Sequence, residues 1–352
     1  MPWQPWSPKH RSLGFGAHED DAGKQNVGIR RQLVTTVQAC AARLRRMADP
    51  VLRALATLTR FTVRRGETWR DGRALRWVEA GSGDLTVICD ASLGEPGSLA
   101  WAGLLPVVPA FARVVAYDRA GIGASDPVAS LTLSSHVDDL ITVISATGNP
   151  PSILVGHSLG GILAQLVALR CPELVAGLIL VDPAEEQYLA ALSAEEQQQG
   201  IDLGESVISQ HNAGTLPDTV RSAFAQHARQ LTGDHQLQGL ILDAYVSCYS
   251  TPSQARMIRD EHELAFKSLP QIRHLRAEGT LPDVPVIVLS ATTGRPEEER
   301  RVWTSYHEAL VAGASRGKHV VLPDTSHAIN QERTEEIVKA IRSVISDIRA
   351  RP

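Results

Sequence analysis

The sequence has little of what would assign it to several large protein classes. Its 352 residues include four cysteines, far apart and without a C-x-x-C pair, which excludes a zinc ribbon and a disulfide framework. These are Cys40, Cys89, Cys171 and Cys248, and we expect Cys89 and Cys171, in apolar surroundings, to be reduced core residues. We expect neither a metal ion nor a cofactor in this chain.

Long apolar runs and an excess of positive charge are also missing. The net charge is −4 and the arginines lack interleaved aromatic residues, so nothing favours a nucleic-acid partner. No uninterrupted apolar stretch approaches the roughly 20 residues that cross a bilayer, and the N-terminus lacks the pattern of a signal peptide. We expect a cytoplasmic protein without an integral membrane span, and the sequence leaves its oligomeric state open.

The N-terminal part of the chain differs in composition from the rest. Residues 1–28 are rich in Pro, Gly, His and charge, which predicts a poorly ordered leader. Residues 29–61 are predicted to form a helical arm, with a break at Asp49 and Pro50 at a first helical position. Because the segment Ile29 to Val63 is basic and partly amphipathic, weak contact with a membrane surface is the alternative to packing on the main domain.

From residue 62 onward, short apolar runs alternate with helical patterns. The runs are Leu85 to Cys89, Arg113 to Tyr117, Ile153 to Val155, Leu178 to Val181, Val284 to Leu289 and His319 to Leu322, after an alternating stretch around Leu75 to Glu79. Runs without polar alternation suit strands covered on both faces. Strands that alternate with helices form a largely parallel sheet, so the fold class is α/β. The segment Thr334 to Arg349 is predicted to be the closing helix.

The alternation breaks once, between Val181 and Val284. Helical patterns fill this stretch, at Ala184 to Gln199, Asp218 to Leu231, Leu237 to Cys248 and Pro252 to Phe266. Such an insertion is expected to form a helical cap over the carboxyl edge of the sheet, where α/β proteins bind ligands. We therefore divide the chain into an α/β core at 62–182 and 284–352 and a cap at 183–283.

A candidate nucleophile lies in Gly156-His157-Ser158-Leu159-Gly160, which fits G-x-S-x-G. An apolar run precedes it and a helix-like stretch, Ile162 to Leu169, follows, which is the strand, turn and helix that this motif requires. Small neighbours allow the strained turn that holds a serine hydroxyl out, and the helix N-terminus favours developing negative charge. The plain alternative for Ser158 is an ordinary serine in a glycine-rich turn.

A serine hydroxyl needs a base, and the base needs an orienting acid. His327 is the candidate base, because it follows the last predicted strand and precedes the closing helix. His157 is expected to pack or to line a pocket, and His319, within a strand, to be structural. The candidate acid is Asp182, at the end of a predicted strand, although Asp182-Pro183 could simply end that strand.

The other positions for the acid are weaker. The turn after the second-last predicted strand, Ser290 to Arg295, holds no carboxylate, and Glu297, Glu298 and Glu299 come later, in what is predicted to be a helix. Asp324 is expected to shape a turn. The two N–H groups that would stabilise a developing oxyanion are expected from Leu159 and from the loop Asp90 to Gly94, where Ser92 is the first choice and Leu93 the second.

Four motifs in order make the chain resemble serine hydrolases of the α/β-hydrolase fold. They are D-A-S-L-G at 90–94, A-Y-D-R-A-G-I-G-A-S-D at 116–126, G-H-S-L-G-G at 156–161 and D-T-S-H at 324–327. The resemblance covers residues 63–349. It implies that Asp118 and Arg119 belong to a structural turn, and that the acid has moved to Asp182, because many relatives carry aspartate where this chain has Thr293.

The combined pattern predicts a hydrolase that cleaves an ester or a related acyl bond of a small molecule through Ser158, His327 and Asp182. An acyltransferase or a thioesterase would use the same three residues, and a ligand-binding protein on an inactive hydrolase fold is the alternative from another class. In the cap, Tyr188, Leu192, Leu242, Tyr245 and Tyr249 could line an apolar pocket or simply be core. The residues that bind the substrate stay unknown at this level.

Overall fold

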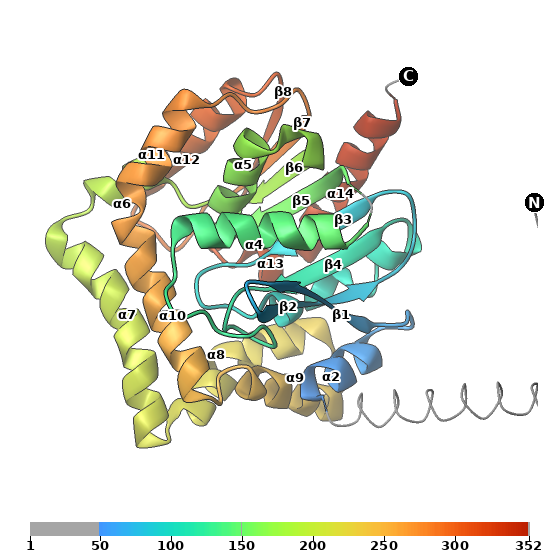
Figure 1. Cartoon of the computed structure of the whole chain (residues 1–352), viewed down its shortest axis with the longest axis vertical. Coiled ribbons are helices and arrows are strands. Elements are labelled where there is room, and N and C mark those ends of the chain that lie inside the picture. Colours follow the sequence, from blue (N-terminus) through green and yellow to red (C-terminus); the bar gives the residue numbers. More distant parts are fainter. Residues whose placement is uncertain (1–48, 149, 351–352) are drawn as a thin grey trace, which may run out of the picture. The chain divides into compact units, whose positions relative to one another are not determined.

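A mixed sheet organises the part of the chain that the computed structural model describes, residues 49–148 and 150–350 (Figure 1). Eight strands of this part pair in the order β1-β2-β4-β3-β5-β6-β7-β8. Their bounds are β1 Arg64–Arg70, β2 Arg73–Ala80, β3 Thr86–Asp90, β4 Arg113–Asp118, β5 Ser152–His157, β6 Val175–Val181, β7 Pro285–Ala291 and β8 Arg316–Leu322. β1 and β2 are antiparallel to their neighbours, and the strands from β4 to β8 run parallel. The predicted leader and the arm up to residue 48 lie outside the described residues.

Both faces of the central strands are buried, which explains their continuous apolar sequences. Successive side chains of a strand point to opposite faces. In β3, Val87 and Cys89 pack in one core cluster, whereas Ile88 packs in the other; Val114 and Val115 of β4 divide in the same way. The sheet therefore separates two apolar layers, and helices cover each of them.

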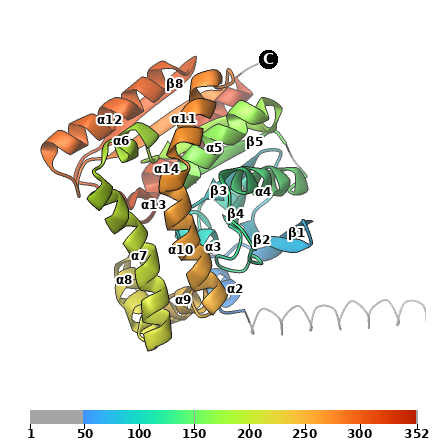
Figure 2. The same cartoon turned by 60° about the vertical axis from the view of Figure 1, so that its left-hand side comes forward.

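The remaining elements connect and cover the strands. The helices are α2 Pro50–Leu58, α3 Gly97–Ala100, α4 Leu133–Ala146, α5 Leu159–Arg170, α6 Glu186–Ala191, α7 Ala194–Ala213, α8 Leu216–Leu231, α9 His235–Ser247, α10 Pro252–Lys267, α11 Leu269–Glu278, α12 Glu297–Ala312, α13 Ile329–Glu332 and α14 Thr334–Arg349, with short 3-10 turns at Ala102–Leu104, Val108–Ala110 and Pro172–Leu174. α4 and α5 lie on one face of the sheet, and α14 lies on the other (Figures 1 and 2). None of the helices within residues 49–148 and 150–350 has the length and apolarity of a membrane span.

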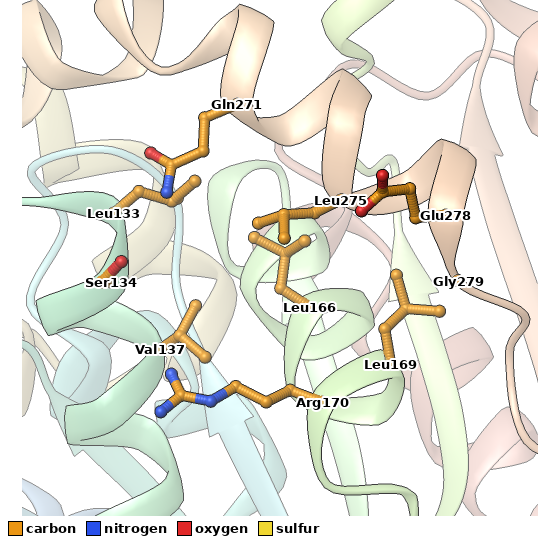
Figure 3. A pocket seen from close by; sticks show the side chains of 10 residues that line it. All are labelled: Leu133, Ser134, Val137, Leu166, Leu169, Arg170, Gln271, Leu275, Glu278 and Gly279. Atoms are coloured by element: carbon orange, nitrogen blue, oxygen red, sulfur yellow. The ribbon is translucent and has the colours of Figure 1, made fainter.

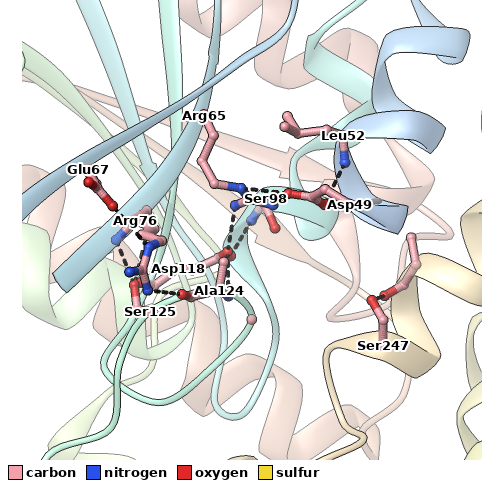
Figure 4. A network of polar contacts seen from close by, with 12 residues as sticks. Asp49, Leu52, Arg65, Glu67, Arg76, Ser98, Asp118, Ala124, Ser125 and Ser247 are labelled. Atoms are coloured by element: carbon pink, nitrogen blue, oxygen red, sulfur yellow. Dashed lines mark hydrogen bonds and ion pairs between the residues drawn. The ribbon is translucent and has the colours of Figure 1, made fainter. Parts of the chain in front are cut away.

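The turn that the D-R-A-G-I-G motif predicts is held by a buried aspartate (Figure 4). Asp118, 1% exposed at the end of β4, accepts hydrogen bonds from the backbone N–H groups of Ser98 at 2.8 Å and Ala124 at 3.1 Å. Arg65 lies 3.8 Å from the same carboxylate and also pairs with Asp49 at 2.8 Å. Asp49 accepts from the N–H of Leu52 at 3.0 Å and thereby caps α2, which Pro50 opens as the sequence predicts.

The stretch between β6 and β7 consists of α6 to α11, which we call the helical insertion. α7 and α10 run side by side along its length (Figures 1 and 2). The single helix predicted over 184–199 is wrong: α6 ends at Ala191, and Ser193 starts α7 through a capping box with Glu196. The sequence analysis also missed α11. A capping serine inside a helical pattern is the signal that marks the first boundary.

Two further predictions change. The strand β1 was missed, because R-R-G-E-T-W-R has hardly any apolar residues and lies at the edge of the sheet, where one neighbour suffices. Cys89 is buried as expected, but the expectation for Cys171 is wrong: this residue is only half-buried, just after α5. Its neighbours Arg170, Pro172 and Glu173 are exposed, because this cysteine lies in the connection between α5 and β6.

Two adjacent carboxylates are buried where the helical insertion begins. Glu185 and Glu186 are 1% and 2% exposed, and both contact the guanidinium of Arg276 on α11, Glu185 at 2.9 Å. Burial raises the pKa of Glu185 to about 7, although the charge of Arg276 opposes the rise. The folded protein therefore holds a proton at Glu185 more tightly than the unfolded chain does.

This raised pKa predicts a pH-dependent stability. The contribution of the protonated Glu185 is fully present below about pH 4.5 and is lost as the pH rises through about 7. We expect Glu185→Gln to remove this loss. The free energy of unfolding of the variant minus that of the unmodified protein should therefore increase by on the order of 3 kcal/mol from pH 5 to pH 8. Urea titrations at both pH values measure the difference. Glu195→Gln, on the exposed face of α7, is the control, and an equal gain in both variants contradicts the prediction.

Candidate active site

The candidate nucleophile lies on a strained turn between β5 and α5. Ser158 has φ 52° and ψ −115°, a conformation that costs on the order of 1–3 kcal/mol for a residue with a side chain. Its N–H donates to Val181 O at 3.1 Å, which continues the pairing of β5 with β6. Its carbonyl accepts from the N–H groups of Gly161 and Ala184, at 3.0 and 3.1 Å. The surrounding backbone therefore maintains the strain.

The glycines of the motif are required by close backbone contacts. A Cβ atom on Gly156 would lie 2.2 Å from the carbonyl oxygen of Gly160. A Cβ atom on Gly160 would lie 2.5 Å from the carbonyl oxygen of Asp90, the last residue of β3. Since real Cβ atoms do not approach this closely, glycine lets α5 start directly against the strand before it and the loop beside it.

The candidate base and the candidate acid are in direct contact. His327 lies in the loop that follows β8, and its Nδ1 atom lies 2.5 Å from Asp182 Oδ2. Asp182 follows β6, is completely buried, and accepts with Oδ1 from Ala291 N at 3.0 Å and from Trp303 Nε1 at 2.9 Å. Because both oxygens of Asp182 are engaged, the carboxylate is fixed in one orientation.

The environment keeps Asp182 ionised. Burial by itself would raise the pKa of this carboxyl, but the hydrogen bond and charge of His327 outweigh burial and hold the pKa well below its usual range. An ionised Asp182 accepts the Nδ1–H of His327, which leaves the lone pair of the ring on Nε2. That nitrogen is therefore the one that can accept a proton from a hydroxyl.

Ser158 and His327 are linked through His157. His157 Nε2 donates to the carbonyl oxygen of His327 at 2.8 Å, and the two rings lie 4.8 Å apart between centroids. Burial lowers the pKa of His157 to about 3, so its ring is neutral. Within residues 49–148 and 150–350, no hydrogen bond joins the hydroxyl of Ser158 to the ring of His327.

A cavity of about 530 Å³ opens beside these residues. His157 and His327 line it, together with the loop after β3, the loop after β7 and side chains of the helical insertion and α13. The lining residues are Ser92, Leu93, Glu95, His157, Phe224, Tyr249, Thr293, Gly294, Arg295, Ser326, His327, Ala328 and Gln331. This volume is of the size that holds a small organic molecule.

A second cavity, of about 400 Å³, lies between α4, α5 and α11 (Figure 3). Leu133 and Val137 of α4 face Leu166 of α5 and Leu275 of α11, and Arg170 and Glu278 lie at its edge. Neither His157 nor His327 lines this second cavity, whereas both line the first. We therefore place the chemistry in the first cavity.

The loop predicted to supply an oxyanion N–H is firmly held. The N–H of Gly160 donates to Ala91 O at 3.1 Å, which joins the loop to the first turn of α5. The guanidinium of Arg119 donates to the carbonyls of Ala91 at 2.7 Å and Ser92 at 2.5 Å. A trans peptide directs its N–H opposite to its C=O. The N–H of Leu93 therefore points away from Arg119, and that of Ser92 points away from α5 and Arg119.

The other predicted residues are distributed as follows. Glu299 accepts from the hydroxyl of Tyr188 at 2.8 Å instead of contacting His327. His319 Nε2 lies 2.7 Å from the hydroxyl of Ser290, in the sheet. Of the five candidates for an apolar pocket, Tyr249 lines the cavity, whereas Tyr245 is buried against Phe224. The structure also places Trp303 and Arg295 beside Asp182, which the sequence analysis missed because both come from segments without a recognisable motif.

Comparison with known proteins decides the family. The profile described as "Alpha/beta hydrolase family" matches residues 92–340, which is well over half of the chain. The chain belongs to this family. Membership of the α/β-hydrolase superfamily and the predicted fold class, a mostly parallel sheet flanked by helices, are both confirmed.

Sequence relatives of this family member include esterases. Lipase LipV of Mycobacterium tuberculosis is 38% identical over 80 residues, 23% of this chain and 29% of that protein. The strigolactone esterase of Arabidopsis thaliana is 32% identical over 113 residues, 31% of this chain and 42% of that protein. In both cases the matched part of the chain spans less than half of the length of the curated relative.

Solved structures extend the likeness to most of the fold. The Cif epoxide hydrolase from Acinetobacter nosocomialis has a TM-score of 0.64 and 18% identity, over 80% of this chain and 88% of that chain. A thermophilic esterase from Thermogutta terrifontis has a TM-score of 0.58 and 20% identity, over 81% and 99%. At such identities the likeness establishes the fold, so the activity must be argued from the site.

Proposed function

We propose that this chain is a serine hydrolase that cleaves an ester or a related acyl bond of a small molecule. The contact between Asp182 and His327, 2.5 Å, carries the proposal, because it leaves a basic Nε2 at the edge of the sheet where Ser158 follows β5. The proposed roles are nucleophile for Ser158, general base for His327 and orienting acid for Asp182. The esterases among the relatives support this class of substrate.

The reaction would proceed in two steps. The Ser158 hydroxyl attacks the acyl carbon while His327 Nε2 accepts its proton, and His327 then protonates the leaving group. A water molecule, deprotonated by His327, attacks the acyl-enzyme, and the proton returns to Ser158. Through both steps, the N–H groups of Leu159 and of the loop after β3 would stabilise the oxyanion. Between Ser92 and Leu93, the direction of the peptide planes favours Leu93.

Ser158 argues against the epoxide chemistry named for one structural neighbour. Relatives that cleave epoxides use an aspartate nucleophile, and a serine in its place offers no carboxylate to open the ring. A ligand-binding role is weakened by the strain at Ser158, which has a stability cost that binding does not require.

A fluorophosphonate probe tests the proposal directly. The probe forms a covalent bond only with an activated serine, so we expect stoichiometric labelling of Ser158, located by mass spectrometry of the peptide. His327→Ala should label far more slowly, because the hydroxyl then has no base. Ser305→Ala, at an exposed position of α12 away from the cavity, is the control, and its labelling should be unchanged. An unlabelled protein, or label on another serine, would falsify the mechanism.

A further inference from the structure

A buried ion pair links the end of β4 to the helical insertion. Arg119, directly after β4, is 2% exposed. Its guanidinium contacts Glu261 of α10 through two bonds, from Nε to Oε1 at 2.7 Å and from Nη2 to Oε2 at 2.9 Å. Glu261 is completely buried. Two parallel hydrogen bonds between an arginine and a carboxylate fix the orientation of both groups.

Both members of this ion pair make hydrogen bonds to the loop Asp90 to Gly94. At its start, Arg119 Nη1 donates to Asp90 Oδ1 and to the carbonyl of Ala91, both at 2.7 Å. In its middle, Arg119 Nη2 donates to the carbonyl of Ser92. At its end, Glu261 Oε2 accepts from the N–H of Gly94 at 2.6 Å. The two charged groups therefore hold the loop at both ends and at its centre.

The helix that carries Glu261 is itself seated firmly on the core. Met257 and Ile258 of α10 pack against Ile122, in the turn after β4. Gln254 donates from Nε2 to the carbonyl of Gly123 at 2.9 Å. A Cβ atom on Gly94 would lie 2.8 Å from Ile258 Cγ2, so the loop and the helix are in close contact. The loop therefore contacts α10 through Glu261 and through Ile258.

The groups that face Glu261 keep it charged. Burial favours the neutral acid, but the positive charge of Arg119 outweighs burial and lowers the pKa of Glu261. His136 of α4 lies 3.4 Å from Oε1, and burial lowers its own pKa to about 4, so it is neutral. Asp90, the third charged group here, faces Arg119 from the opposite side at 2.7 Å. Glu261 is therefore the carboxylate that satisfies the Nε side of the guanidinium.

We propose that Glu261 is a positioning residue that holds the loop Asp90 to Gly94 in the conformation that stabilises the oxyanion. It acts through Arg119, which binds the carbonyls of Ala91 and Ser92, and directly through the N–H of Gly94. The inference rests on the proposed function, because the loop matters to turnover only if an oxyanion forms beside Ser158. Under this proposal the helical insertion has two roles: it lines the cavity, and through Glu261 it positions the loop that stabilises the oxyanion.

Glu261→Gln tests this role. An amide keeps the shape but places N–H donors against the donors of Arg119, so the loop loses its support. The measured quantity is kcat for 4-nitrophenyl acetate, divided by the fraction of Ser158 that fluorophosphonate labels at the endpoint. We expect this kcat per labelled serine to fall about 10- to 100-fold, while KM stays within twofold of the unmodified value. The inhibition constant of phenylboronic acid, which forms a tetrahedral adduct with the serine, should rise by the same factor as kcat/KM falls.

Glu263→Gln is the matched control, because Glu263 is exposed on the same helix and pairs with Lys267; its kinetics should match those of the unmodified protein. If Glu261→Gln does not fold, Glu261→Asp, which keeps the charge at a shorter reach, should show a smaller loss in kcat at unchanged KM. An unchanged kcat per labelled serine, or a rise in KM alone, overturns the positioning role. Failure of the unmodified protein to label overturns the proposed function instead, so the two results are distinguishable.

Discussion

Replacing Ser158 with alanine is expected to lower kcat for an activated ester by about a millionfold, to the level set by the remaining oxyanion donors. The variant lacks the oxygen that forms the acyl-enzyme, and the other members of the site cannot replace it. The backbone N–H and carbonyl of residue 158 keep their partners in β6 and α5. We therefore expect a folded protein, and the rate is measured with 4-nitrophenyl acetate against an enzyme-free blank.

The backbone strain at position 158 allows a second comparison, between alanine and glycine variants. Because Ser158 has a positive φ, alanine retains the strain and glycine relieves it. Ser158→Gly should therefore unfold at a higher denaturant concentration than Ser158→Ala, while both remain inactive. An alanine variant that keeps a substantial part of the activity would eliminate Ser158 as the nucleophile.

Replacing Asp182 with asparagine is expected to lower kcat by about 10⁴-fold. The amide can still accept from Ala291 N and Trp303 Nε1 through its oxygen. Its NH₂ group then faces His327 Nδ1, which must accept instead of donate, so the ring proton moves to Nε2 and the base is lost. The substitution thus changes the protonation of the His327 ring while it preserves the packing. Initial rates of ester hydrolysis at pH 7 and pH 9 measure the loss of activity.

Glu298→Gln provides the comparison for the acid. Glu297, Glu298 and Glu299 are the other carboxylates that the sequence offers for this role, and they open α12. We expect Glu298→Gln to keep kcat within twofold. The reverse ranking, a severe loss at position 298 and a mild one at 182, would move the acid to α12.

Much of the architecture could be predicted because it depends on local patterns. The continuous apolar strands and the small residues around Ser158 follow from burial on both faces and from the 2.2 and 2.5 Å approaches at Gly156 and Gly160. The boundaries of individual helices inside the helical insertion were less predictable, since a polar helix such as α7 has a weak periodicity. β1 is polar and could be recognised only from its pairing with β2.

The candidate site could be predicted where a residue occupies a fixed place on the strand order, as Ser158, Asp182 and His327 do. Its supporting residues could not. Glu261 lies 142 positions after Arg119, and Trp303 lies 121 positions after Asp182. Neither has a motif, and each is placed by the packing of α10 and α12 on the core. Such contacts depend on tertiary structure alone.

The position of Asp182 after β6 has a consequence for how this protein can change. In the proposed mechanism Asp182 supplies the acid, so the loop after β7 need not carry a carboxylate, and Thr293 and Gly294 of that loop form part of the cavity wall. A mutational library at Thr293 should alter substrate preference while it keeps the backbone bond from the N–H of this residue to Thr325 O. Gly294 is left unchanged, because its φ of 86° favours glycine. Under the proposed function, the choice of acyl group and the proton transfer would then depend on different residues.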